Sequence, residues 1–194
     1  MCIDYRCLNA VTTPDIYPLP RIDDMLDALQ GACYFSTLDC NNGYHQVRVA
    51  HDDRAKMAFI TKQGLFEYLT MPFGLCNVPA TYQRLMDAVL AGLKWECCLV
   101  YLDDVIIFSR SFEQHLCDLE RVFTRFREAR LALQPKKGHL FRRSVAFLGH
   151  VVSAAGLACD PGKVAAIRQL PLPKDLPTLR RFLGIVGYYY RFID

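Results

Sequence analysis

The stretch Cys97-Cys-Leu-Val-Tyr-Leu-Asp-Asp-Val-Ile-Ile-Phe108 decides the fold, because it is an apolar run with two adjacent carboxylates at its centre. It is too long for one strand of roughly 5 to 6 residues, so it predicts two strands folded back at a turn that presents Asp103 and Asp104. No Lys or Arg lies between Trp95 and Ser109. Carboxylates among apolar residues need a positive partner, which favours a metal ion, whereas the structural alternative is that Asp-Asp is a common turn dipeptide.

The composition is that of an ordinary folded chain. Its 194 residues are 52% hydrophobic and 22% charged, which suits one domain or one domain plus a piece. No stretch approaches the roughly 18 apolar residues of a membrane span, and the chain does not begin with a basic segment followed by an apolar one, so we expect a soluble, intracellular protein. The nine cysteines include no Cys-x-x-Cys and predict reduced, mostly buried thiols.

The charge is unevenly distributed along the chain. Residues 1–53 contain eight Asp and three Arg, a net charge of −5, so residues 54–194 carry +8 of the total of +3. This asymmetry indicates an acidic site beside a track for a polyanion, and the alternative is a solvated helix face. The clustered basic residues are Arg121, Arg125, Arg127, Arg130, Lys136, Lys137, Arg142 and Arg143, followed later by Arg180 and Arg181.

Alternating and β-branched segments predict several strands. Residues 33–38 run directly into Asp39, which therefore lies at a strand end. The other extended segments are residues 44–50, a hairpin of residues 55–61 and 65–69 with exposed Lys56 and Lys62, and residues 131–133 and 145–152 on either side of the loop 135–138.

Helical spacing of apolar residues predicts two main helices. Pro79 suits the first turn of one helix, and Ser111 with Gln114 forms a capping box for the other. The expected buried positions are Tyr82, Leu85, Met86, Val89, Leu90 and Leu93 in the first helix, and Leu116, Leu119, Phe123 and Phe126 in the second. Beyond about residue 157, helices from Asp160-Pro161 and from Pro177 predict a small helical appendage.

This interleaving of strands and helices predicts an α+β fold. A split βαβ layout has an antiparallel sheet with helices on one face, and it leaves the opposite face free to hold a substrate. In that layout Asp39 and the Asp103-Asp104 turn could meet.

Taken together, the segments closely resemble the reverse transcriptase domain of gypsy-type long-terminal-repeat retrotransposons, related to retroviral polymerases. The match extends along the whole chain. It is carried by Cys2-Ile-Asp-Tyr-Arg6 with Leu8-Asn9, Thr37-Leu-Asp39 with Gly43-Tyr-His-Gln46, Lys56-Met-Ala-Phe59, Met71-Pro-Phe-Gly-Leu75 with Pro79-Ala80, Tyr101-Leu-Asp-Asp104, Phe147-Leu-Gly-His150, and Phe182-Leu-Gly184 with Tyr188-Tyr189.

The resemblance implies a right-hand polymerase that copies an RNA or DNA template by extending a primer with deoxynucleotides. Its implied divisions are a palm of residues 14–46 and 78–157, fingers of residues 1–13 and 47–77, and the start of a thumb or connection region in residues 158–194. RNase H and integrase modules are expected in the full polyprotein and are not in this chain. We therefore expect a fragment of a pol polyprotein, located in the cytoplasm, a retroelement particle or the nucleus.

The resemblance also implies a metal site. Asp39 and Asp103 would each ligate two Mg²⁺ ions about 3.5 to 4 Å apart, with Asp104 as a supporting carboxylate and Mn²⁺ as a tolerated substitute. Two carboxylates about 4 Å apart at an effective dielectric near 20 repel by ~4 kcal/mol, so such a cluster needs cations.

Substrate contacts follow from the same resemblance. Tyr44 matches the family's sugar gate, with a core tyrosine as the structural alternative, and Phe73 and Gly74 match the loop that packs on the incoming sugar and the template. Lys137 matches the triphosphate-side lysine, with Lys136 as the other candidate and a solvated turn lysine as the alternative. The nucleic-acid contacts implied are Tyr101 and the primer grip, Leu148 and Gly149.

Two departures from the family pattern leave two functions open. The Lys and Arg that hold the triphosphate in the family's fingers lie upstream of the Cys2 match, so we expect truncated fingers, and Met57 replaces the usual Thr. The leading function is an RNA-directed DNA polymerase core, and the alternative is a non-catalytic nucleic-acid-binding remnant of a retroelement. An unrelated phosphotransferase would need a phosphate cradle, but the chain has no G-x-x-x-x-G-K motif.

Overall fold

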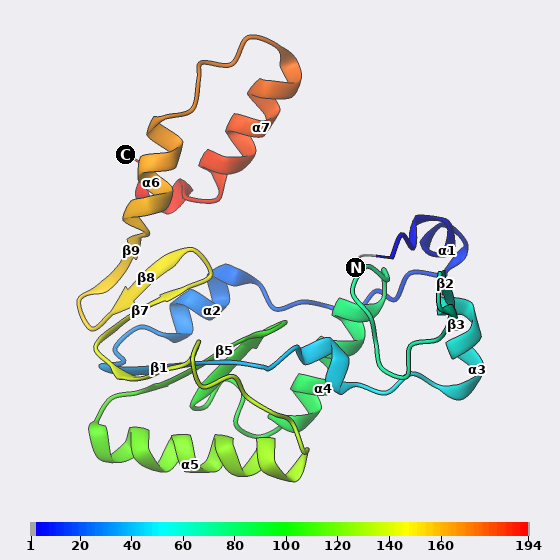
Figure 1. The fold of residues 1–194 in the computed structure, drawn as a ribbon. Coiled ribbons are helices and arrows are strands. Elements are labelled where there is room, and N and C mark those ends of the chain that lie inside the picture. The colour runs from blue at the N-terminus through cyan, green and yellow to red at the C-terminus, as the bar shows by residue number, and fades with distance from the viewer. Residues whose placement is uncertain (1–2, 194) are drawn as a thin grey trace.

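A four-stranded antiparallel sheet forms the centre of the protein. The computed structural model describes residues 3–193, so Met1, Cys2 and Asp194, including the first residue of the Cys2–Arg6 motif, lie outside the described residues. The strands stand in the order β4-β5-β1-β6, with β1 at Tyr34–Asp39, β4 at Cys98–Tyr101, β5 at Asp104–Ser109 and β6 at His139–Arg142 (Figure 1). The predicted α+β class is confirmed.

The apolar run folds back as predicted. Strands β4 and β5 pair from Cys98↔Ile107 to Tyr101↔Asp104, and the turn between them consists of Leu102 and Asp103. Leu102 takes a left-handed conformation with φ 53°, which is unusual for a residue with a branched side chain.

Two long helices cover one face of the sheet, as the apolar spacing predicts. Helix α4 (Val78–Val89) and helix α5 (Phe112–Glu128) lie together against β1, β4 and β5 (Figure 1). Ser111 caps α5 by accepting a hydrogen bond from the backbone N–H of Gln114. Leu116 is 54% exposed, so its assignment to the buried stripe is wrong. Val122 is fully buried in its place, one helical turn before Phe126.

The opposite face of the sheet is largely covered, which corrects the expectation of a free face. Helix α2 (Ile22–Ala28) and a second sheet of β7 (Ser144–Phe147), β8 (His150–Ser153) and β9 (Gly156–Cys159) pack on it. They bury Phe35, Leu99 and Ile106, which alternate along their strands with the residues that face α4 and α5.

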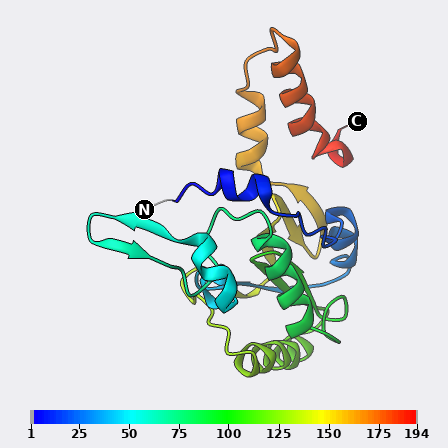
Figure 2. The same ribbon diagram turned by 90° about the vertical axis from the view of Figure 1, so that its right-hand side faces the viewer.

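A smaller region extends from one side of the core, and its hairpin projects furthest (Figures 1 and 2). It contains α1 (Arg6–Val11), α3 (His51–Arg54), η2 (Ala55–Met57) and a hairpin of β2 (Phe59–Thr61) and β3 (Gly64–Phe66). The hairpin is confirmed with shorter strands than predicted, and Lys56 and Lys62 are exposed as expected.

Three strand predictions are wrong in detail. Residues 44–50 do not form an extended segment, because Gly43–Gln46 form the 3-10 turn η1 after Asn42 enters a left-handed conformation. Residues 131–133 contribute only the isolated bridge Cys40↔Leu133. Strand β6 instead lies at His139–Arg142, between the predicted loop and the next predicted strand. Residues 145–152 form two strands, because Leu148 and Gly149 both have positive φ and reverse the chain.

The helical appendage is confirmed. Asp160 caps α6 (Pro161–Arg168), Asp175 caps α7 (Leu176–Gly187), and η3 (Tyr190–Phe192) follows; together they project from the end of β9 (Figures 1 and 2). The appendage returns to the core where Arg191 forms ion pairs with Asp23 (3.1 Å) and Asp27 (2.9 Å).

The eight described cysteines are free thiols, and most of them are not buried, which corrects the second half of that prediction. Only Cys40, Cys97 and Cys98 are buried. Within residues 3–193, no helix is long and apolar enough to cross a membrane.

Candidate active site

Asp39 and Asp104 face each other across two neighbouring strands. They are the last pair in the register of β1 and β5, and Tyr101 pairs with Asp104 from the other side. Because paired residues of antiparallel strands project from the same face, these three side chains form one row across the end of the sheet. Asp103 lies beside that row, in the turn.

The two carboxyls of the turn are electrostatically unfavourable in their ionised form. Burial raises the pKa of Asp103, and the neighbouring charges of Asp39 and Asp104 raise it further. Partial burial raises the pKa of Asp104, and the charge of Asp39 raises it further. Asp104 is nevertheless more exposed than Asp103. The charge of Asp39 thus contributes to the raised pKa of both Asp103 and Asp104.

Asp103 lies in a tight space beside η1 and α4. Its Oδ1 atom is buried and has no hydrogen-bond partner among the described residues, and the same holds for the hydroxyl of Tyr82. A Cβ atom at Gly43 would lie 2.5 Å from that hydroxyl and 2.8 Å from Asp103 Oδ1. Glycine is therefore required at position 43, which explains its place in the Gly43–Gln46 motif.

Lys137 is the lysine that the fold brings to the carboxylates. Its Nζ lies 3.3 Å from Asp39 Oδ2. Of the two candidate lysines, Lys137 contacts this site, whereas Lys136 is exposed in the same turn. The ion pair is largely open to solvent, so it contributes little to stability.

Tyr44 and Phe73 lie against each other. Their ring centroids are 5.2 Å apart, and Tyr44 also packs edge-on against Tyr82 at 5.2 Å. Tyr44 is half-buried; burial and then the charge of Asp103 raise its pKa. Phe73 is 55% exposed, and Gly74, with φ 97°, lies against the ring of Tyr5. Tyr44 thus forms the inner wall and Phe73 the outer wall of one aromatic surface.

The turn of Leu148 and Gly149 lies at the same site. A cavity of about 330 Å³ is lined by that turn together with Asp39, Asp104 and Lys137, and also by His139 and Lys163. The hydroxyls of Tyr188 and Tyr189 donate hydrogen bonds to the carbonyls of Leu148 (2.6 Å) and Gly149 (3.2 Å). The appendage therefore holds the turn in place.

The sequence interpretation missed Gln83. This residue is fully buried on α4, and its Oε1 accepts a hydrogen bond of 2.7 Å from the backbone N–H of Leu102. A glutamine inside the apolar stripe between Tyr82 and Met86 is the signal that could have found it, because a buried amide needs partners.

The basic stretch on α5 does not face the carboxylates. Helix α5 covers the sheet face opposite Asp39. Arg121 forms ion pairs with Glu96 (2.9 Å) and Asp118 (3.3 Å). Arg121 is therefore paired with two carboxylates of the protein.

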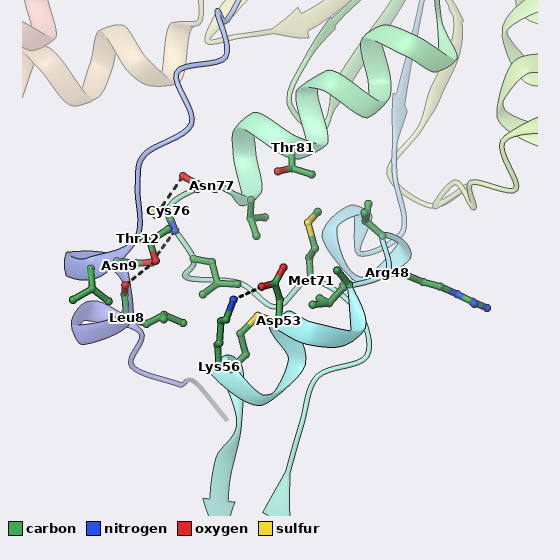
Figure 3. A pocket seen from close by; sticks show the side chains of 17 residues that line it. Leu8, Asn9, Thr12, Arg48, Asp53, Lys56, Met71, Cys76, Asn77 and Thr81 are labelled. Carbon is green, nitrogen blue, oxygen red and sulfur yellow. Dashed lines mark hydrogen bonds and ion pairs between the residues drawn. The ribbon is translucent and has the colours of Figure 1, made fainter.

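A larger cavity of about 570 Å³ lies away from the carboxylates (Figure 3). It lies between α1, the segment 47–57 and the start of α4. Asn9 holds its walls together by accepting a hydrogen bond from the backbone N–H of Cys76 and donating one to the carbonyl of Gly74. Lys56 and Asp53 form an ion pair of 2.6 Å at its edge.

The residues present suit a hard divalent cation. The donors are carboxylate oxygens, which Mg²⁺ prefers, and a buried carboxylate oxygen of Asp103 lacks a partner. Across residues 3–193, however, no group of three or more His, Cys, Asp or Glu side chains is placed so that it could hold a metal ion, and Asp39 contacts Lys137.

Known proteins share this sequence and fold. The family described as reverse transcriptase (RNA-dependent DNA polymerase) matches residues 1–152. The retrovirus-related Pol polyproteins of transposons 297 and gypsy from Drosophila melanogaster are 47% and 40% identical over 98% and 100% of this chain, which spans 18% and 19% of their lengths.

Two solved structures of foamy viral protease-reverse transcriptase have the same fold. The form in complex with double-stranded DNA matches with a TM-score of 0.87 at 26% identity, covering 95% of this chain and 32% of that one. The form in complex with an RNA/DNA hybrid matches with a TM-score of 0.81 at 26% identity, covering 95% and 25%. The sequence match over residues 1–152 and the shared fold show that this chain belongs to the reverse transcriptase family.

Proposed function

We propose that this chain is the polymerase core of a reverse transcriptase, which adds deoxynucleotides to the 3′-hydroxyl of a primer on an RNA or DNA template. The observation that carries the proposal is the row of Tyr101, Asp104 and Asp39 at the open end of the sheet, with Asp103 beside it. The family generally needs divalent metal ions.

Asp39, Asp103 and Asp104 would hold two Mg²⁺ ions, or Mn²⁺ in their place. When bound, these ions lower the pKa of the primer hydroxyl and neutralise the triphosphate. The carboxylates would otherwise repel one another, as the raised pKa of Asp103 indicates.

Lys137 would exchange its contact with Asp39 for a contact with the triphosphate. Its ammonium is exposed and only 3.3 Å from the carboxylate, so a polyanion entering the cavity of about 330 Å³ can compete for it. Lys137 would then orient the phosphates by charge, because an ammonium acts as a point charge with three donors.

Tyr44 and Phe73 would select the sugar. The ring of Tyr44 is fixed between Phe73 and Tyr82, so it cannot withdraw easily from a 2′-hydroxyl. Phe73 and Gly74 would contact the incoming nucleotide and template, and Leu148, Gly149 and Tyr101 the primer strand.

The corresponding divisions are a palm of residues 14–46 and 78–157, fingers in residues up to 13 and 47–77, and the start of a thumb from residue 158. The carboxylate row and both long helices would then belong to the palm. The cavity of about 570 Å³ would lie where fingers and palm meet.

A primer-extension assay tests the function. The purified chain is given a labelled DNA primer on an RNA template, deoxynucleotides and MgCl₂, and Asp39→Asn is compared with Asp52→Asn, whose side chain is 99% exposed. We expect extension by the unaltered chain and by Asp52→Asn, and none by Asp39→Asn. Binding of primer-template without extension would support the non-catalytic remnant instead.

Melting temperature supplies a readout that does not depend on activity. Mg²⁺ that binds only the folded state raises the melting temperature. We expect that rise in the unaltered chain and a clearly smaller one in Asp39→Asn. An equal rise in both would contradict the metal assignment.

A further inference from the structure

Strand β6 pairs with β1 through a β-bulge. Phe35 of β1 is opposite Arg142 of β6, and Thr37 is opposite His139. These two pairs are two residues apart along β1 but three residues apart along β6. Strand β6 therefore carries one extra residue over this interval. Phe141 lies inside it with φ 52°, a left-handed conformation that residues with a Cβ atom rarely adopt, so the bulge needs support.

The bulge sets where the turn that carries Lys137 meets β1. With Arg142 opposite Phe35, even antiparallel pairing would bring Leu140 opposite Thr37, whereas the extra residue brings His139 there. On the other side of the turn of residues 135–137, the backbone N–H of Gln134 donates to the carbonyl of Asp39 (2.9 Å). The turn between these two contacts presents Lys137, whose Nζ lies 3.3 Å from Asp39 Oδ2.

A chain of buried polar groups holds the bulge. The backbone N–H of Phe141 donates to Ser36 Oγ (3.1 Å), which lies 2.7 Å from His115 Nε2. On the other side of the ring, His115 Nδ1 lies 2.9 Å from Ser109 Oγ, and Ser109 donates to Asp118 Oδ2 at 2.8 Å. The four side chains are at most 6% exposed.

The direction of these hydrogen bonds is determined. A hydroxyl has one proton, and Ser109 gives its proton to Asp118, so Ser109 Oγ must accept from His115 Nδ1–H. Burial lowers the pKa of His115, and in the neutral ring Nε2 is then an acceptor. Ser36 therefore donates to Nε2 and keeps a lone pair for the N–H of Phe141. Every polar side-chain atom of Ser36, His115, Ser109 and Asp118 therefore has a hydrogen-bond partner.

We propose that Ser36 and His115 are positioning residues of the candidate active site, because they hold the bulge of β6 that places Lys137 against Asp39. The part that concerns nucleotide use rests on the proposed function, whereas the part that concerns the bulge does not. Neither residue touches the carboxylates, so both would act through Phe141 and the register of β6.

The bulge is tested by NMR on the ¹⁵N-labelled chain. We expect the His115 ring to show the neutral Nδ1–H form and the Phe141 amide to be protected from exchange. His115→Leu should remove that protection, whereas His115→Gln, whose carbonyl can accept from Ser36, should keep much of it. The amide of Val152, on β8, serves as the reference in the same spectra. An unprotected Phe141 amide in the unaltered chain, or equal protection in both variants, would overturn the proposal.

Nucleotide use is tested with Ser36→Ala. We expect its KM for deoxynucleotide to rise by up to about 100-fold with a smaller change in kcat, and Ser144→Ala, an exposed serine on β7, to leave both unchanged. In a Lys137→Ala background Ser36→Ala should add no further loss. A further loss of similar size there would show that Ser36 does not act through Lys137.

The proposed function and the positioning role of Ser36 and His115 are contradicted by different results. If the unaltered chain does not extend a primer, the proposed function fails and the amide protection of Phe141 still decides the bulge. If the unaltered chain extends a primer and Ser36→Ala folds and uses nucleotide equally well, the function stands and the positioning role is wrong. If Ser36→Ala does not fold, His115→Gln and His115→Leu provide the same comparison.

Discussion

The Oε1 atom of Gln83 on α4 accepts a hydrogen bond of 2.7 Å from the backbone N–H of Leu102, the residue immediately before Asp103. The amide group of the same side chain donates to Asp87 (2.9 Å) and to the carbonyl of Val100 (3.4 Å). The turn that carries the carboxylates is therefore fixed by a buried side chain of a neighbouring helix as well as by its own strands.

Gln83→Leu should destabilise the protein and misplace Asp103. The backbone N–H of Leu102 would lose its acceptor, which costs about 1 to 3 kcal/mol when the group stays buried. Urea unfolding measures that loss, and primer extension should slow in parallel. Gln63→Leu, in the exposed β2–β3 turn, should stay within about 0.5 kcal/mol of the unaltered chain; equal effects of both changes would contradict the role of Gln83.

Asp103→Asn should abolish primer extension and stabilise the fold in the absence of metal. Burial and the charges of Asp39 and Asp104 raise the pKa of Asp103 above the usual 3.8, so the folded state binds this proton more tightly than the unfolded chain does. Its contribution to stability is present below pH 3.8 and is lost as the pH rises through the folded pKa. At pH 7 the neutral amide should therefore raise the free energy of unfolding by about 0.5 to 2 kcal/mol. Urea unfolding in EDTA checks this, and a less stable variant would contradict it.

Tyr44→Ala should increase the use of ribonucleotides relative to deoxynucleotides. Removing the ring opens space where Tyr44 now packs against Phe73 and Tyr82. Tyr44→Phe keeps the ring and should keep the discrimination. The ratio of kcat/KM for the two nucleotides in single-nucleotide extension measures the effect. An unchanged ratio in Tyr44→Ala would show that Tyr44 only packs in the core and does not select the sugar.

His115 should make the stability depend on pH. Its pKa is lowered in the folded state from the usual 6.5, so the unfolded chain binds a proton more readily. The stability it contributes is therefore present above about pH 6.5 and falls as the pH drops from there through the folded pKa. Urea unfolding at pH 5 and pH 8 should show a smaller difference in His115→Gln than in the unaltered chain. A pH dependence that stays the same in both would contradict the neutral, buried ring.

Local sequence was sufficient for the carboxylate hairpin, the two long helices and the capped helices of the appendage. In each case the signal lies within a few neighbouring residues: an apolar run interrupted by Asp103 and Asp104, helical spacing after Pro79, or a cap such as Ser111. The family motifs likewise named Asp39, Tyr44 and Lys137, because those residues stand at fixed places beside recognisable neighbours.

Only the tertiary structure decided what surrounds those residues. Helix α2 and the second sheet cover Phe35 and Ile106, Leu102 donates a hydrogen bond to Gln83, and β6 pairs with β1 through a bulge. Each of these contacts joins segments that are far apart in the chain. Periodicity shows which side of an element is apolar, but it does not show which partner covers that side or in which register two distant strands pair. Those choices depend on packing and on the pairing of buried polar groups, which exist only once the chain has folded.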